Sequence, residues 1–298
     1  MGSHGTIRLR PIGPYNFHLS FQFYHRSRFE TVDRFADRYF VRPLMLGKIP
    51  VLIKIPCVSR GLVDCLSISW YSPAEVGDTR PLRRLLTRML YLDFDLDEFY
   101  RRPLDPMMRK LIRKYRGFRP ILTPDTFEAA AWAIIGQQVN LQFAYQLKSR
   151  LVAAVDRTFQ VDGERYHLFP RADEIATMTI NTLRAMQLSQ RKAEYLLDFS
   201  RMVADGRLDL EALAGDEYET ACEKLMSIRG LGPWSANYIL MRGAGHRDAF
   251  PFGDSGINHA LCSLYGAKAR AGANHITKLS NRWRPYRALA CFYLWKSL

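Results

Sequence analysis

The sequence reads Leu225-Met-Ser-Ile-Arg-Gly-Leu-Gly-Pro-Trp-Ser-Ala-Asn-Tyr-Ile-Leu240 across its most informative segment. An amphipathic helix is predicted to end near Ile228, and Gly230 and Gly232 then follow on either side of one apolar residue. Pro233 opens a second helix at a position where its missing N–H removes no helical hydrogen bond. The segment therefore predicts two helices joined by a short hairpin.

The glycines of this hairpin suggest a function as well as a turn. Glycine permits unusual backbone dihedrals and leaves its N–H group uncovered by a side chain. Such donors, beside the positive N-terminus of a helix, suit a phosphate oxygen and would bind DNA backbone without reading its sequence. An ordinary tight turn between helices uses the same glycines, so the hairpin alone leaves both interpretations open.

The charge of the chain favours a polyanionic partner. The 298 residues carry a formal net charge of +14, with 48% hydrophobic and 24% charged residues. This composition is typical of an ordered globular protein of two or three domains. The excess of positive charge attracts nucleic acid at long range, although a basic surface without that partner would look the same. No apolar stretch has the length that a bilayer requires.

The cysteines favour a reducing compartment. Their number is odd and their spacing lacks any C-x-x-C pair, which argues against a disulfide scaffold, a structural zinc or an iron–sulfur cluster. The cysteines are at positions 57, 65, 222, 262 and 291. Since no apolar targeting segment follows Met1, we expect an intracellular protein, either cytoplasmic and nucleoid-associated in a prokaryote or nuclear.

The periodicity of hydrophobic residues divides the chain into two regions. Apolar and polar residues alternate over 17–23, 51–55 and 66–70, which predicts strands in an α+β domain with an antiparallel sheet over residues 1–80. A helical region is predicted over residues 81–298.

Several helices of that region can be placed. Thr123 is predicted to cap a helix that ends near Gly136, and a second helix is predicted over Leu141–Val155. Further amphipathic helices are predicted over 191–202 and 217–226.

Ile228-Arg-Gly-Leu-Gly-Pro-Trp-Ser-Ala-Asn-Tyr238 resembles the signature hairpin of the helix-hairpin-helix (HhH-GPD) DNA glycosylases, and in particular that of the 3-methyladenine DNA glycosylase II (AlkA) group. That group has an aspartate about twenty residues later, at the head of the next helix, where this chain has Asp254. The stretches 133–138 and 282–287 extend the resemblance, which covers residues 110–298 well. It implies a mostly α fold in which a small sheet domain packs against two helical subdomains around a DNA-binding cleft.

Asp254 is the candidate catalytic residue. A simple N-cap is the alternative role, and a helix N-terminus would also favour its ionised form. Cleavage of an N-glycosidic bond builds positive charge on the sugar, and the resemblance implies that this carboxylate stabilises the charge or orients a water. The implied activity is that of a monofunctional DNA glycosylase of base-excision repair. It would flip out alkylated purines such as 3-methyladenine and leave an abasic site.

Trp234 bears on the reaction type. The resemblance implies that bifunctional relatives, including 8-oxoguanine DNA glycosylase, have at this position an attacking lysine that forms a Schiff base and permits strand cleavage. Because tryptophan offers no such nucleophile, no lyase activity is expected.

Aromatic residues would form the base pocket, since a π-face attracts a cationic methylated base. The resemblance assigns Trp234, Tyr238, Tyr286 and Phe23 to it, although Tyr286 stands where the AlkA group has a tryptophan. Aromatics at helical spacing also fill ordinary cores, and that is the role expected of Trp132 and Trp283.

The resemblance also implies the DNA contacts. Gln138 matches the wedge that fills the gap left by the flipped base, a leucine in the AlkA group; a polar helix terminus is the alternative. Backbone N–H groups that would face a phosphate belong to Gly230, Gly232 and Ser235. Carbonyls that would hold a structural cation, monovalent or calcium, belong to Met226, Ile228 and Leu231.

The expected partner is double-stranded DNA that contains damaged bases, with no membrane and no cofactor for catalysis, and the expected state is a monomer. Two alternatives stay open: a glycosylase of the same fold for hypoxanthine or oxidised guanine, and a non-catalytic helix-hairpin-helix DNA-binding protein. The retention of Asp254 in its expected context argues against the second. An iron–sulfur relative is disfavoured because only Cys262 and Cys291 follow the catalytic position.

Overall fold

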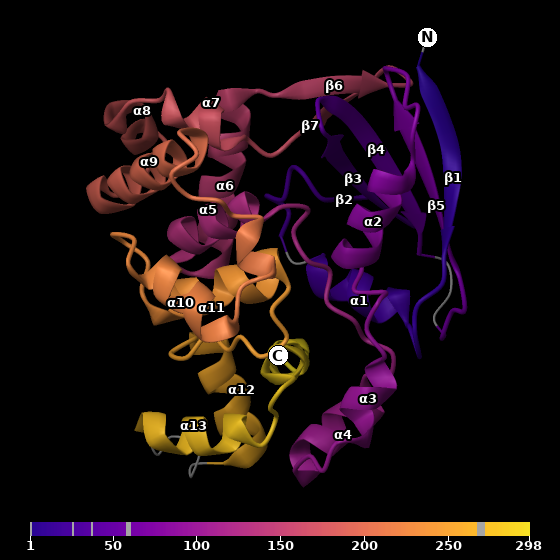
Figure 1. The fold of residues 1–298 in the computed structure, drawn as a ribbon, viewed down its shortest axis with the longest axis vertical. Helices are drawn as coiled ribbons and strands as arrows, with labels where there is room; N and C mark the ends of the chain where they lie inside the picture. Colours follow the sequence, from indigo (N-terminus) through magenta and orange to yellow (C-terminus); the bar gives the residue numbers. More distant parts are fainter. Residues whose placement is uncertain (1, 26, 37, 58–60, 267–271) are drawn as a thin grey trace.

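The computed structural model describes residues 2–25, 27–36, 38–57, 61–266 and 272–298. Its N-terminal part is built around an antiparallel sheet with the strand order β1-β5-β4-β3-β2, seen on the right of Figure 1. The strands are β1 (Ser3–Leu9), β2 (Arg34–Ala36), β3 (Tyr39–Leu46), β4 (Ile49–Pro56) and β5 (Leu66–Ser72). The strands predicted over 51–55 and 66–70 are thereby confirmed.

The strand predicted over 17–23 is wrong, because this stretch forms helix α1 (Phe17–Tyr24). Its N-cap is Asn16, whose side chain accepts a hydrogen bond from the Leu19 N–H at 3.1 Å. Phe17 packs with the sheet, whereas Phe23 packs with the core of the helical region. Because the helix is covered on both sides, its apolar residues do not form the single stripe by which an amphipathic helix is recognised.

The helical region begins with α2 (Arg80–Met89), which packs its Leu82, Leu86 and Met89 side chains into the core beneath the sheet. A hairpin from farther along the chain also reaches the sheet, as Figure 1 shows: β6 (Thr158–Val161) and β7 (Glu164–His167) share a small core with β3 and β4. The contacts of α2 and of the β6–β7 hairpin with the sheet both cross the domain boundary predicted at residue 80. The division into two domains at that residue stays a prediction.

The remaining helices form the mostly α part of the fold, which confirms the predicted fold class. They are α3 (Leu96–Arg101), α4 (Pro106–Lys114), α5 (Thr126–Gly136), α6 (Leu141–Val155), α7 (Ala172–Ala176), α8 (Ile180–Ala185), α9 (Gln190–Ala204), α10 (Tyr218–Met226), α11 (Pro233–Ile239), α12 (Ser255–Tyr265), α13 (Gly272–Asn281) and α14 (Arg287–Lys296), with a 3-10 turn η1 (Ala212–Ala214) and a π-helical turn η2 (Leu240–Ala244). Those predicted over Leu141–Val155, 191–202 and 217–226 are observed as α6, α9 and α10.

Helix α5 is the centre of the helical region. It packs against α6, α9, α11 and η2, and apolar residues surround it on all sides, as is typical of a buried helix. It ends at Gly136 as predicted, but its N-cap is Asp125 rather than Thr123. The Asp125 carboxylate accepts from the Glu128 N–H at 2.8 Å, while the Thr123 hydroxyl donates to the carbonyls of Asp125 and Arg242 at 2.7 and 3.1 Å.

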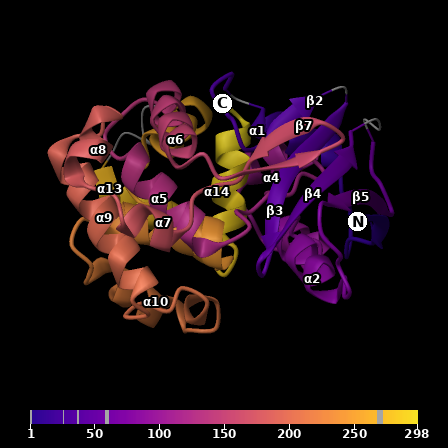
Figure 2. The same ribbon diagram turned by 90° about the horizontal axis from the view of Figure 1, so that it is seen from above.

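The helical region and the sheet meet along α1 and α14. Figure 2 shows α14 between the helices on one side and the strands on the other. Phe292 of α14 contacts Phe23 of α1, with ring centroids 6.4 Å apart. None of the described helices is long and apolar enough to cross a membrane.

Candidate active site

The hairpin joins α10 to α11, as predicted. Gly230 has φ +94°, and a Cβ there would collide with the ring of Tyr195, so this position requires glycine. Gly232 differs from the expectation of unusual dihedrals, since its φ of −97° and ψ of −176° are ordinary extended backbone. A Cβ at Gly232 would have no heavy atom within 4 Å, so the backbone here faces open space at the head of α11.

Gln137, for which the sequence gives no signal, links this hairpin to the end of α5. The amide nitrogen of Gln137 donates to the Gly230 carbonyl at 2.8 Å and to the Ser235 hydroxyl at 3.0 Å. Ser235 is buried and its hydroxyl is already occupied by Gln137, so its contact with a phosphate stays a prediction. Gln138, the next residue, is exposed and has φ +54°. The structure therefore presents Gln138 at a turn that Gln137 anchors to the hairpin.

The three carbonyls predicted to hold a cation lie where α10 ends and the hairpin turns. The last carbonyls of a helix lack intrahelical partners and carry partial negative charge. The Ile228 carbonyl already accepts the Leu231 N–H at 3.0 Å, which leaves one lone pair for a ligand. Oxygen donors of this kind fit a hard cation, and the Met226, Ile228 and Leu231 prediction stays a prediction.

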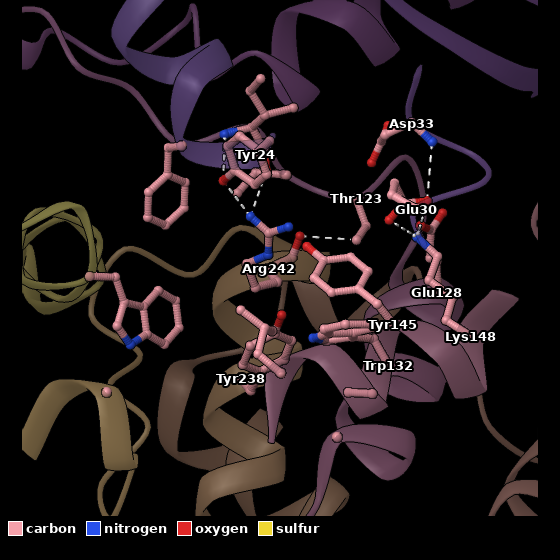
Figure 3. Close-up of a pocket in the computed structure, with 18 of the residues that line it drawn as sticks. Tyr24, Glu30, Asp33, Thr123, Glu128, Trp132, Tyr145, Lys148, Tyr238 and Arg242 are labelled. Carbon is pink, nitrogen blue, oxygen red and sulfur yellow. Dashed lines mark hydrogen bonds and ion pairs between the residues drawn. The ribbon is translucent and has the colours of Figure 1, made fainter. Parts of the chain in front are cut away.

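A cavity of about 310 Å³ lies where the sheet, α1, α5, α6, α11 and α14 meet, within the range of roughly 300–1,000 Å³ usual for small-molecule sites. Figure 3 shows its interior. Aromatic side chains from both regions line it: Phe23, Tyr24, Phe40, Trp132, Tyr145, Trp234, Tyr238 and Trp295. The rings of Trp234 and Tyr238 stack with centroids 5.3 Å apart. The cavity therefore offers aromatic walls to a flat ligand.

Asp254 lies in the wall of this cavity as the N-cap of α12. Its Oδ1 accepts hydrogen bonds from the Ile257 N–H at 2.8 Å and from the Trp295 indole at 2.9 Å. Its Oδ2 accepts from the Trp234 indole at 2.9 Å. The two roles weighed for this residue are thus compatible in the structure, because capping uses one oxygen while two tryptophans of the aromatic wall hold the carboxylate in place.

The predicted pocket residues are brought together with one exception. Trp234, Tyr238 and Phe23 line the cavity beside Asp254. Tyr286 is not among the described lining residues: it lies against Phe94, 5.2 Å between centroids, and its hydroxyl donates to Glu98 at 3.1 Å.

The reason for this exception is the position of α14. Tyr286 precedes the first residue of α14, whereas Trp295 near the other end of that helix reaches Asp254. The sequence does not predict the role of Trp295, because its partner Asp254 lies 41 positions away and only the fold brings the two together. Trp132 also departs from its expected core role, because it lines the cavity; Trp283 is fully buried as expected.

A buried group of charges forms one end of the cavity, on the right of Figure 3. Arg42 of β3 pairs with Asp33 at 2.6 Å and with Glu128 of α5. Lys148 of α6 pairs with Glu30 at 3.0 Å and with Glu128 at 3.5 Å. Burial alone would lower the pKa of Lys148, but Glu30 and Glu128 outweigh it and raise that pKa. We call these five residues the buried ion cluster.

The comparisons with known proteins agree with this geometry. The family described as HhH-GPD superfamily base excision DNA repair protein matches residues 131–285. A DNA-3-methyladenine glycosylase of Bacillus subtilis is 31% identical over 274 residues, covering 92% of this chain and 90% of that protein. DNA-3-methyladenine glycosylase 2 of Escherichia coli is 25% identical over 291 residues, covering 97% and 96%.

The solved structures show the same fold. The 3-methyladenine DNA-glycosylase from Archaeoglobus fulgidus superposes with a TM-score of 0.83 at 25% identity, over 97% of each chain. The chain therefore belongs to the HhH-GPD superfamily of base-excision DNA repair proteins, in its AlkA-like group.

Proposed function

We propose that this chain is a monofunctional DNA glycosylase that removes alkylated purines from double-stranded DNA and acts as a monomer. The observation that carries the proposal is the position of Asp254: its carboxylate is held by two indoles in the wall of an aromatic cavity, and one of these indoles belongs to the first turn after the hairpin. The names of the relatives, DNA-3-methyladenine glycosylases, support alkylated bases as the substrate.

The mechanism follows from these parts. The N–H groups of Gly230, Gly232 and Ser235 would hold a phosphate, with a cation on the nearby carbonyls adding positive charge. The damaged nucleotide turns out of the stack into the cavity, and Gln138 fills the gap. As the bond to the base breaks, positive charge develops on the sugar, and the Asp254 carboxylate stabilises it and orients the attacking water.

The charges of the cavity favour a base that is already cationic. Its lining carries four carboxylates and three cationic side chains, a net charge of −1 in a chain whose formal net charge is +14. Aromatic faces attract cations as well. A purine alkylated at N3 or N7 carries a positive charge in the nucleotide, and it leaves without further protonation, so a single carboxylate is sufficient.

The function is tested with duplex DNA treated with dimethyl sulfate, which methylates guanine at N7 and adenine at N3. We expect the protein to release free methylpurines from this DNA and nothing from untreated DNA. A chain that binds the methylated duplex but releases no base would contradict the proposal and support a DNA-binding protein without catalysis.

The phosphate contact is tested by Gly232→Ala. Since a methyl group at this position meets only open space, the fold should tolerate it, while the methyl group would occupy the place of the phosphate. A hydrogen bond to a charged group contributes roughly 1.5–3 kcal/mol, so we expect duplex affinity to fall about tenfold or more. Gly77→Ala is the control, because Gly77 also faces open space and lies far along the chain from the hairpin. Equal duplex affinities for the Gly232→Ala and Gly77→Ala variants would show that Gly232 does not contact DNA.

A further inference from the structure

Helix α4 carries a group of positive charges that the proposed mechanism does not use. The sequence has no aspartate or glutamate between Asp105, which caps this helix, and Asp125, which caps α5. The helix buries the apolar side chains of Met108, Leu111 and Ile112. Its exposed side consists of Arg109, Lys110, Arg113 and Lys114. We call these four residues the α4 basic face; Figure 1 shows α4 at the lower end of the molecule, away from the strands.

The α4 basic face lacks acidic partners. Two cations close to it in the sequence do have such partners: Arg101 pairs with Asp95 at 3.2 Å. Arg116 likewise pairs with Asp97 at 3.3 Å. Within the part of the chain that the structure describes, none of the four residues of the α4 basic face forms an ion pair. Like charges four residues apart on a helix repel one another, so this arrangement destabilises α4 when no anion is bound.

The helix dipole explains only part of this arrangement. Cations in the last turn of a helix are stabilised by its partial negative charge, and Arg113 and Lys114 lie in that turn. Arg109 and Lys110 lie before it, where the effect has fallen off. A solvated helix face usually carries charges of both signs, whereas this face carries one sign only. An anionic partner therefore explains the face better than the stability of the helix does.

The C-terminal end of α4 adjoins the end of α14 that borders the cavity. The Lys114 ammonium lies 5.0 Å from the centroid of the Tyr115 ring, and the ammonium of Lys296 in α14 lies 5.9 Å from the same centroid. Leu298, two residues after Lys296, lines the cavity. The positive charge of α4 thus continues onto the C-terminal end of α14, beside the place where the damaged nucleotide is held in the proposed function.

We infer that the α4 basic face binds the phosphate backbone of the duplex that flanks the damaged nucleotide. The inference rests on the proposed function, because its partner is the duplex held at the hairpin. The nine residues of α4 span roughly 14 Å at about 1.5 Å each, and duplex DNA presents one negative charge for roughly every 1.7 Å of its axis. Each lysine or arginine that neutralises a phosphate releases counterions, so the contact strengthens binding without selecting a base.

The test compares the binding of two duplexes, each with one central abasic site, by fluorescence anisotropy at several salt concentrations. One duplex has about 10 base pairs, a single helical turn, and the other has about 30. The α4 variant carries Arg109→Gln, Lys110→Gln, Arg113→Gln and Lys114→Gln, because glutamine removes the charge and keeps helix propensity. For the long duplex we expect the affinity to fall about 10-fold or more and the slope of log affinity against log salt to shrink by about 2–4. For the short duplex, which ends close to the cavity, both changes should be much smaller.

The matched control removes the same number of positive charges in and around β1, α2 and the turn between β3 and β4. All of its positions are exposed, and its substitutions are Arg8→Gln, Arg10→Gln, Lys48→Gln and Arg84→Gln. Because only the overall charge changes, it should weaken the binding of both duplexes slightly and equally. A loss that is confined to the α4 variant and to the long duplex supports the inference. An α4 variant that binds the long duplex as the unmodified protein or the control variant does overturns it.

Two further outcomes are distinguishable. If the α4 variant does not fold, Arg109→Gln with Lys110→Gln takes its place, since these two residues lie outside the last turn; the slope should then shrink by about 1–2, and an unchanged slope overturns the inference. Methylpurine release by the unmodified protein tests the proposed function separately. A protein that releases no base, but whose α4 variant loses affinity for the long duplex, would contradict the proposed function and still support the contact between α4 and DNA.

Discussion

Asp254→Asn is expected to reduce base release by about 100-fold or more while the protein stays folded and still binds DNA. Loss of a fixed group that stabilises transition-state charge has effects of this order. Asparagine has the same shape and caps helices as well as aspartate does, so α12 should persist. What disappears is the negative charge, and the amide nitrogen would also oppose one of the two indole N–H groups of Trp234 and Trp295.

Asp105→Asn is the control for this variant. Asp105 caps α4 and accepts a hydrogen bond from the Trp283 indole at 2.8 Å, so the same substitution removes the same kinds of contact. It lies outside the described lining of the cavity. Single-turnover release from methylated DNA should therefore stay near the unmodified rate. Comparable losses for the two variants would mean that Asp254 acts through stability rather than through chemistry.

Glu128→Gln is expected to lower the free energy of unfolding by about 1–3 kcal/mol, the range for a buried polar group that loses one partner, since Arg42 keeps Asp33 and Lys148 keeps Glu30. Glu128 is 3% exposed and lies between Arg42 and Lys148, and it joins β3 to α5 and α6. Glutamine keeps the shape but leaves both cations with less compensating charge. Urea or thermal unfolding followed by circular dichroism measures the change.

A surface pair gives the comparison for this stability effect. Glu194 bonds Arg229 at 2.7 Å across α9 and the hairpin, but both side chains reach solvent. Exposed ion pairs contribute little because water already solvates both partners. We therefore expect Glu194→Gln to leave the unfolding midpoint unchanged. If Glu128→Gln also leaves the unfolding midpoint unchanged, the buried ion cluster does not stabilise the contact between the sheet and the helices.

The sequence predicts those parts of the site that depend on local structure. Gly230 and Pro233 specify the hairpin between α10 and α11, because the positive φ of Gly230 and the missing N–H of Pro233 each suit the backbone at their position. Asp254 is identified by the family resemblance, since it stands about twenty residues after the hairpin at the head of the next helix, and the structure places it as the N-cap of α12. Helix α6 was predicted with its observed bounds, since its apolar residues form one face and its neighbours are polar.

The features that the sequence does not predict depend on contacts between elements that are distant along the chain. Trp295 and Arg242 enter the cavity because α14 and η2 pack beside α1, and no spacing along the chain indicates it. The family resemblance predicts Tyr286 in the base pocket, although its ring packs against Phe94 instead. The stretch 17–23 alternates like a strand, yet two separate cores cover the helix that it forms.

The central claim, that Asp254 and the aromatic cavity excise an alkylated base without cutting the strand, is tested most directly with a duplex that contains one 3-methyladenine. The free base and the strand breaks are measured separately, before and after alkali, for the unmodified protein and for Asp254→Asn. We predict release by the unmodified protein alone, with breaks only after alkali. Breaks before alkali, or equal release by both proteins, would contradict the account.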